Sequence, residues 1–121
     1  MHADWRQLAR ECGMTVVGDT IEVPLGRGRR QTVAVEDGGA HVRLWSVVVR
    51  AGRVDESVHE RAWTRNRLSE FVGFRLDRRG RLVGETRVPD DASAEEWAFL
   101  VHNLASACDH FEYLLTGRDI E

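Results

Sequence analysis

The segment SAEEWAFLVHNLASACDHFEYLLTG, residues 93–117, is the longest part of the sequence with one clear period. Its apolar residues recur at steps of three and four, which places them on one broad stripe of an α-helix. These residues are Trp97, Leu100, Val101, Leu104, Cys108, Phe111, Leu114 and Leu115. Ser93 and Glu96 have the spacing of a capping box, and Gly117 is placed to end the helix. A helix with one apolar stripe has to cover another element, so we expect it to lie on a sheet.

Several short segments before this helix alternate apolar and polar residues, which is typical of half-buried β-strands. Three of them, near residues 20–24, 30–36 and 41–50, are separated by glycine-containing turns and predict an antiparallel meander. Two more, residues 71–77 and 81–88, flank the turn Arg78-Arg79-Gly80 and predict a second hairpin. The sheet should therefore be antiparallel, with about five strands.

Two further segments have a helical pattern. Residues 3–11 place several apolar side chains on one face, and Gly13 is positioned to end that helix. A second helix begins with Asp55 or Ser57 as its cap and runs to about Leu68. The order helix, three strands, helix, two strands, helix predicts an α+β domain with helices packed on the sheet.

The composition predicts one globular domain over residues 1–121, with 42% hydrophobic and 31% charged residues. The net charge of −3 is spread along the chain, which argues against a dedicated partner among nucleic acids or membranes. The densest basic patch, Arg27, Arg29 and Arg30, is interpreted as a solvated turn, with an anionic partner as the alternative. Neither a signal peptide nor a membrane-spanning run is recognisable, so we expect a soluble, cytoplasmic protein.

The residue types that carry chemistry do not form a catalytic or metal-binding pattern. Cys108 and His110 lie about 200° apart around a helix and cannot share a metal ion. All positive side chains are arginines, which excludes lysine-dependent chemistry. Cys12 and Cys108 are interpreted as reduced thiols, and a disulfide between them stays open. We therefore expect no enzyme activity, no metal and no cofactor.

Two carboxylates near the end of the last helix, Asp109 and Glu112, are three residues apart and share a face. Because carboxylates are unfavourable at a helix C-terminus, a basic partner is expected, most simply the arginine-rich second helix. Ion pairs within the domain, a solvated face and contact with a partner protein are the open interpretations.

The sequence contains four tryptophans, more than is usual for a domain of this size. Trp45 and Trp97 are expected in the core, because they lie on the strongest strand and the longest helix. Trp5 and Trp63 lie on weaker helices and are expected to be partly exposed, as residues at contact surfaces are. Packing of both rings inside the domain is the alternative.

The run NRLSEFVGFRLDRRGRLVGETRVPDD, residues 66–91, is followed by a helix that ends ASACDHFEYLLTGRD, residues 105–119. Together they resemble the YbjN-like family, which is related in fold to type III secretion chaperones such as the Tir chaperone group. The resemblance covers the C-terminal half, and the order of elements agrees over the whole chain. Its residues are Asn66, the FxLDxxGxLV hairpin (Phe74, Leu76, Asp77, Gly80, Leu82, Val83), Asp109, Phe111 and Glu112.

The resemblance implies a non-enzymatic, chaperone-like module of bacterial origin. Such proteins are small acidic homodimers that hold an extended peptide or protein segment of a client against helix and sheet surfaces. The residues predicted to contact a partner are Trp5, Leu8, Trp63, Asp109 and Glu112. The residues predicted to pack in a homodimer are Val48, Val58 and Ala62.

Two other functions are considered. The first is a small-molecule-binding domain or hydrolytic enzyme with its site on the last helix, formed by His102, Asp109, His110 and Glu112. A closed pocket lined by these side chains would favour it. The second is a structural or immunity-type subunit that occupies the surface of one dedicated protein.

Overall fold

Six strands form one antiparallel sheet in the computed structural model, which describes residues 4–68 and 71–116. In chain order they are β1 (Thr15–Val17), β2 (Thr20–Gly26), β3 (Arg29–Asp37), β4 (His41–Val49), β5 (Gly73–Leu76) and β6 (Leu82–Pro89). Their spatial order is β1-β2-β3-β4-β6-β5. The α+β class and the antiparallel sheet are confirmed. The additional strand is β1, a brief apolar run that pairs with β2 through the turn at Gly18.

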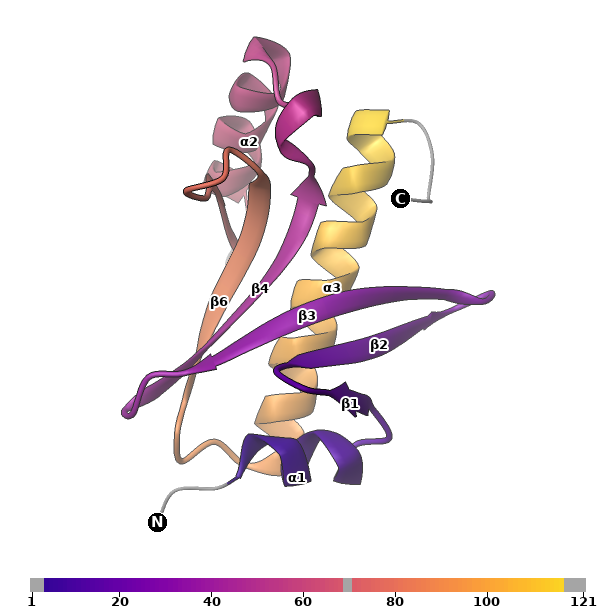
Figure 1. The fold of residues 1–121 in the computed structure, drawn as a ribbon, viewed down its shortest axis with the longest axis vertical. Helices are drawn as coiled ribbons and strands as arrows, with labels where there is room; N and C mark the ends of the chain where they lie inside the picture. The colour runs from indigo at the N-terminus through magenta and orange to yellow at the C-terminus, as the bar shows by residue number, and fades with distance from the viewer. Residues whose placement is uncertain (1–3, 69–70, 117–121) are drawn as a thin grey trace.

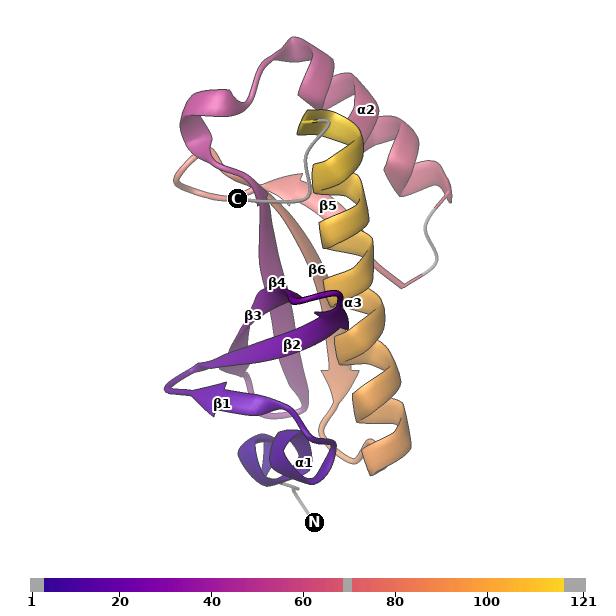
Figure 2. The same cartoon turned by 90° about the vertical axis from the view of Figure 1, so that its right-hand side faces the viewer.

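The helices are α1 (Trp5–Glu11), α2 (Glu56–Leu68) and α3 (Ala94–Thr116), with a short 3-10 helix, η1 (Ala51–Arg53), before α2. Helix α3 lies along one face of the sheet and contacts β2, β3, β4 and β6 (Figure 2). Helix α1 packs against α3 and β1, whereas α2 packs against β5. The predicted capping box is confirmed, since Ser93 Oγ accepts from Glu96 N at 3.1 Å and Glu96 Oε1 accepts from Ser93 N at 2.9 Å. Asp55, rather than Ser57, caps α2 by accepting from Val58 N.

The sheet divides into two ribbons that diverge. Strands β3 and β4 pair only from Ala34↔Trp45 to Asp37↔Val42, whereas β4 pairs with β6 along its whole length. In Figure 1, β2 and β3 cross β4 and β6 at a wide angle. The second half of β4 therefore separates from the first half of β3, which leaves an opening in the sheet.

The core lies between α3 and the sheet, as the apolar stripe of the last helix predicts. Trp97, Val101, Leu104, Cys108 and Phe111 are all buried, whereas Leu114 is exposed. The close approach of α3 to β6 requires Gly84, because a Cβ there would lie 2.5 Å from Cys108 Sγ. The predicted end of the helix at Gly117 lies outside the described residues.

Two of the tryptophans are not where the sequence predicts them. Trp5 is only 5% exposed, because α1 folds against α3 and stacks Trp5 on Trp97 with ring centroids 6.4 Å apart. The expected exposure of Trp5 is therefore wrong. Trp45 is half-buried and points away from α3, because it alternates along β4 with the buried Leu44 and Ser46. The expectation that Trp45 belongs to the core under α3 is also wrong.

The residues predicted for dimer packing are buried within the chain. Val48, Val58 and Ala62 are 3%, 8% and 7% exposed and belong to the core cluster. Their burial leaves them little surface for a second copy. Cys12 and Cys108 are both free thiols, and burial raises the pKa of Cys108 to about 12. None of the described helices has the length and apolar character needed to cross a bilayer.

Candidate binding face of the sheet

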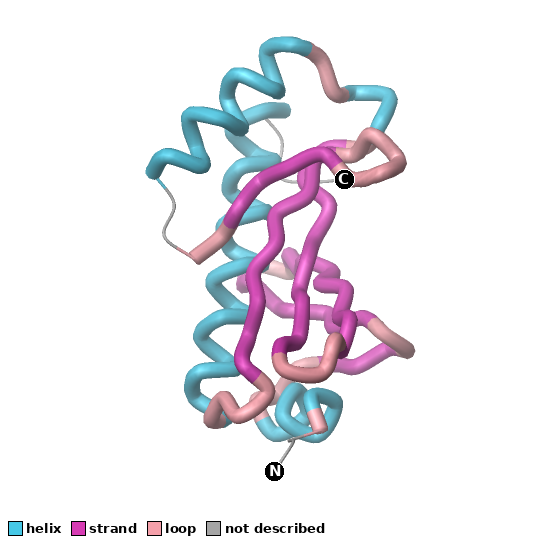
Figure 3. The backbone as a smooth tube through the Cα atoms, turned by 90° about the vertical axis from the view of Figure 1, so that its left-hand side faces the viewer, coloured by secondary structure: helices cyan, strands magenta, loops and turns pink. Residues whose placement is uncertain are grey.

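The face of the sheet opposite α3 is lined by strands rather than by a helix. Figure 3 shows β4, β5 and β6 in front of α3, so that this face points toward the viewer. Because side chains alternate along a strand, β4 presents Arg43, Trp45 and Val47 here and directs Leu44 and Ser46 to the core. We call this surface the open face.

Trp45 is the centre of the open face. Three surface hollows, of about 450, 730 and 620 Å³, all include Trp45 in their walls. The first lies at the opening between β3 and β4, the second extends toward α1, and the third extends toward the β5–β6 turn. The guanidinium groups of Arg43 and Arg81 lie 5.5 and 5.7 Å from the Trp45 ring centroid. Cation–π contacts of this kind hold a half-buried ring in a fixed position.

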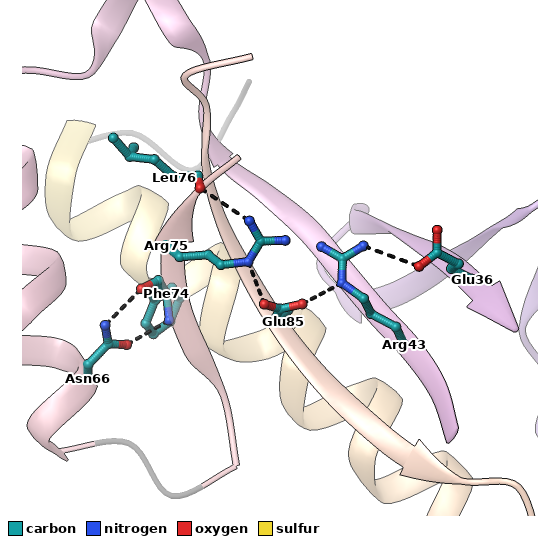
Figure 4. Close-up of polar contacts among 7 residues, drawn as sticks. All are labelled: Glu36, Arg43, Asn66, Phe74, Arg75, Leu76 and Glu85. Atoms are coloured by element: carbon teal, nitrogen blue, oxygen red, sulfur yellow. Dashed lines mark hydrogen bonds and ion pairs between the residues drawn. The ribbon is translucent and has the colours of Figure 1, made fainter. Parts of the chain in front are cut away.

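A row of alternating charges crosses four strands of this face (Figure 4). Nε of Arg75 on β5 and Nε of Arg43 on β4 each donate to a carboxylate oxygen of Glu85 on β6. Arg43 also lies 3.9 Å from Glu36 on β3. Burial acts to raise the pKa of Glu85, but the hydrogen bonds from the two arginines outweigh it, so the pKa lies below its ordinary value. Glu85 is therefore the anionic centre of a cross-strand network.

The β5–β6 turn is held by Asp77. Its Oδ1 accepts from the backbone N–H groups of Arg79 and Arg81, each at 2.9 Å, and its Oδ2 accepts from Arg81 Nε at 2.8 Å. These bonds outweigh burial and lower the pKa of Asp77. Gly80 completes the turn with φ of +77°. The motif FxLDxxGxLV thus fixes a turn that directs Arg78 and Arg79 to the rim of the third hollow.

The outer edge of the sheet at β5 is partly covered by Asn66 of α2. Its side chain donates to Phe74 O at 2.7 Å and accepts from Phe74 N at 2.6 Å, as a neighbouring strand would (Figure 4). An edge strand whose backbone groups are bonded in this way is less open to pairing with another strand. This contact gives Asn66, one of the residues of the resemblance, a structural role.

The opening between β3 and β4 is bridged by side chains instead of backbone hydrogen bonds. Gln31 Nε2 donates to Ser46 Oγ at 2.8 Å and to Val47 O at 3.3 Å, and Ser46 Oγ donates to Thr32 O at 2.7 Å. The carbonyl groups of Thr32 and Val47 therefore point into the opening. At this place the sheet offers strand edges that side chains, rather than a strand, occupy.

The acidic residues of the last helix are buried and lie apart from one another. Asp109 is 7% exposed and accepts an ion pair from Arg29 of β3 at 2.8 Å, so the expected pairing with α2 is wrong. Asp109, His102 and His110 line a hollow of about 330 Å³, whereas Glu112 lines the opening between β3 and β4. The described residues include no group of three or more His, Cys, Asp or Glu side chains that could hold a metal ion.

The remaining partner-contact residues differ in their access to solvent. Leu8 is half-buried against the core, whereas Trp63 is 64% exposed on α2, as the sequence predicts. Exposed apolar side chains continue from Trp63 to Leu68, Phe71 and Leu76. No finding tests the roles predicted for these residues. The open face was missed because its apolar centre, Trp45, was assigned to the core; the alternation of Arg43, Trp45 and Val47 was the available signal.

Solved structures match this architecture over nearly the whole chain. A chain of the ExoU-SpcU complex from the type III secretion system of Pseudomonas aeruginosa has a TM-score of 0.64, with 18% identity over 94% of this chain and 97% of that one. A chain of the ExsC-ExsE complex has a TM-score of 0.63, with 16% identity over 92% of each chain. The chain has the fold of a type III secretion chaperone.

A third match is the structure of the Yersinia pestis type III secretion chaperone SycH in complex with a stable fragment of YscM2. It has a TM-score of 0.53 and 12% identity over 88% of this chain and 95% of the matched chain. No family model and no curated protein matches the sequence. The predicted likeness to these chaperones is confirmed at the level of the fold, and the YbjN-like part of the resemblance stays a prediction.

Proposed function

We propose that this protein is a non-enzymatic, chaperone-like module that holds an extended segment of a partner protein. The observation that carries the proposal is the opening between β3 and β4 beside Trp45. The matched SycH structure contains a fragment of a second protein, and ExoU-SpcU is a heterodimeric complex. A protein partner for this chain agrees with that likeness.

The opening can accept an extended segment by strand addition. In that mode, main-chain hydrogen bonds supply affinity and alternate side chains enter pockets. The carbonyl groups of Thr32 and Val47 already accept from side chains, which a segment's N–H groups could replace. Ala34, Trp45 and Val49 line the adjoining hollow and would receive the alternate apolar side chains.

The proposed homodimer forms through the outer surface of α2 rather than through Val48, Val58 and Ala62. Trp63 and Leu68 are 64% and 73% exposed on this helix, and large exposed apolar patches mark protein contacts. Replacing Trp63 with Asp should convert a dimer into a monomer, measured by size exclusion with light scattering. Tyr113→Asp, on an exposed position of α3, is the matched control. A wild type that stays monomeric at high concentration would remove the dimer.

Site-specific photocrosslinking in the native cell tests segment binding. A photoreactive side chain at Thr32, which is exposed at the opening, should give adducts that mass spectrometry identifies as protein segments. The same group at Glu95, exposed at the start of α3, is the control and should give few adducts. One recurring adduct would favour a dedicated partner and several would favour a general chaperone. Adducts at position 95 but not at position 32 would contradict the proposal.

The hydrolytic or small-molecule alternative is less favoured by the geometry. The Asp109 carboxylate is held by Arg29, and Glu112 lines a different hollow from His102 and His110. The four residues therefore do not surround one substrate. The cytoplasmic location is part of the proposal, because a chaperone must meet its partner where that partner is made; cell fractionation tests it.

A further inference from the structure

We infer that the open face selects a segment rich in Asp and Glu, which lies with its carboxylates over the Arg78–Arg79 turn and an apolar side chain on Trp45. The inference rests on the proposed function and specifies its ligand. Although the chain has a net charge of −3, the third hollow is lined mainly by arginines. These are Arg43, Arg75, Arg78, Arg79 and Arg81, accompanied by the acidic Glu36 and Asp77.

The ion pairs inside this hollow leave positive charge in excess. Arg43 and Arg75 share one carboxylate, that of Glu85, and Arg81 pairs with Asp77 at 2.8 Å. Arg78 and Arg79 are exposed and make no ion pair with any residue that the structure describes. The turn that carries them is held by Asp77, so two cations are presented at a defined place beside Trp45.

The charge of the open face has a direction. The opening between β3 and β4 carries Arg30, Arg50 and Arg53 on its walls, so positive charge lies on two sides of Trp45. The second hollow has the opposite balance, with four carboxylates against two arginines. Its charged residues are Asp4, Asp19, Glu36, Asp37, Arg6 and Arg43. A segment on this face is therefore favoured when its acidic part lies toward β5 and β6 and away from α1.

This division of charge favours a polypeptide over a nucleic acid. Arginines beside an aromatic ring also suit single-stranded nucleic acid, whose bases stack on such rings. A nucleic acid, however, is negative along its whole length and would meet the carboxylates of the second hollow. A peptide can place acidic residues on one side of Trp45 only, and it can also pair with the strand edges at Thr32 and Val47.

Fluorescence anisotropy with three matched peptides tests the inference on the full chain. Each peptide has about twelve residues of alternating Val and Thr, and the polar positions of one half carry Glu, Gln or Lys. The Glu peptide should bind about tenfold more tightly than the Lys peptide at low salt. The difference should shrink at about 0.5 M salt, where the Debye length is only a few ångströms.

Charge-reversal variants locate the selectivity. Arg78→Glu combined with Arg79→Glu should abolish the preference for the Glu peptide, and R78Q/R79Q should reduce it. The matched control is Arg10→Glu with Arg61→Glu, which makes the same change of net charge at exposed positions on α1 and α2. This control should keep the preference within about twofold. Circular dichroism and thermal unfolding verify that each variant is folded.

Different failures have different meanings. Equal binding of the Glu and Lys peptides would overturn the charge selectivity and leave segment binding intact. Loss of the preference in the control as well as in the turn variant would assign it to net charge and overturn the role of this turn. Displacement of the Glu peptide by a thymidine oligonucleotide of equal length at similar affinity would overturn the choice of a polypeptide. Absence of binding by all three peptides would remove both this inference and the proposed function.

Discussion

The two faces of the sheet are built from the same alternating strands but have opposite chemistry. The face under α3 is apolar and densely packed, with Leu44 and Val88 fully or nearly fully buried. The open face carries the Arg75–Glu85–Arg43 network around the half-buried Trp45. The comparison teaches that the covered face accounts for the stability of the fold, whereas the open face keeps polar groups and strand edges available to a partner.

The largest expected effect is on the covered face. Phe111 is buried and its ring packs edge-on against Phe74, with centroids 4.8 Å apart. Phe111→Ala should lower the free energy of unfolding by about 3–5 kcal/mol, because it removes apolar burial and leaves a cavity. Urea denaturation measures the change. Tyr113→Ala, on an exposed position of the same helix, is the control and should change stability by less than about 1 kcal/mol. Equal losses would mean that α3 has no distinct buried side.

A second test concerns the close contact between α3 and β6. Gly84→Ala would place a Cβ 2.5 Å from Cys108 Sγ and 3.0 Å from the Phe74 ring, so stability should fall by about 1–3 kcal/mol. Combining it with Cys108→Ala should recover part of that loss, because the sulfur is removed from the contact. Gly73→Ala on β5 is the matched control, since its Cβ would meet nothing within 4 Å. A double variant that is as unstable as the sum of both changes would contradict direct contact.

The sequence predicts the covered face more completely than the open one, for a physical reason. Burial imposes a period, so the stripe from Trp97 to Phe111 could be recognised before the structure was known. Strand alternation does not say which phase faces the helix when both contain apolar residues. Trp45 was misassigned for this reason, since Val42 and Leu44 are equally apolar. The β3–β4 opening depends on where two ribbons diverge, which no local pattern specifies.

Acid should weaken the charge network of the open face. The pKa of Glu85 is lower in the folded chain than its ordinary value of about 4.3, so its ionised form stabilises the fold. This contribution is complete above the unfolded pKa and is lost as the pH falls through the folded pKa. Glu85→Gln should cost about 1 kcal/mol at pH 7, and the difference from wild type should shrink as the pH falls below about 4. Unfolding curves over this pH range measure it.

The control for the acid test is Glu60→Gln, which removes an exposed carboxylate from α2. It should change stability little and in the same way at every pH. A difference between wild type and Glu85→Gln that stays constant down to pH 3 would show that ionised Glu85 does not stabilise the network.

The smallest expected effect has the opposite sign. Arg87 of β6 stands directly opposite Arg43 of β4 on the open face, and like charges at such a cross-strand pair are destabilising. Arg87→Glu should therefore raise the free energy of unfolding by about 0.2–1 kcal/mol, whereas Arg87→Gln should give about half of that gain. Chemical denaturation measures both variants. If the open face is shaped for acidic segments, the more stable Arg87→Glu protein should also bind the Glu peptide more weakly. A gain in stability without that loss would mean that the arginine pair is not kept for binding, and it would separate the stability of this face from its charge selectivity.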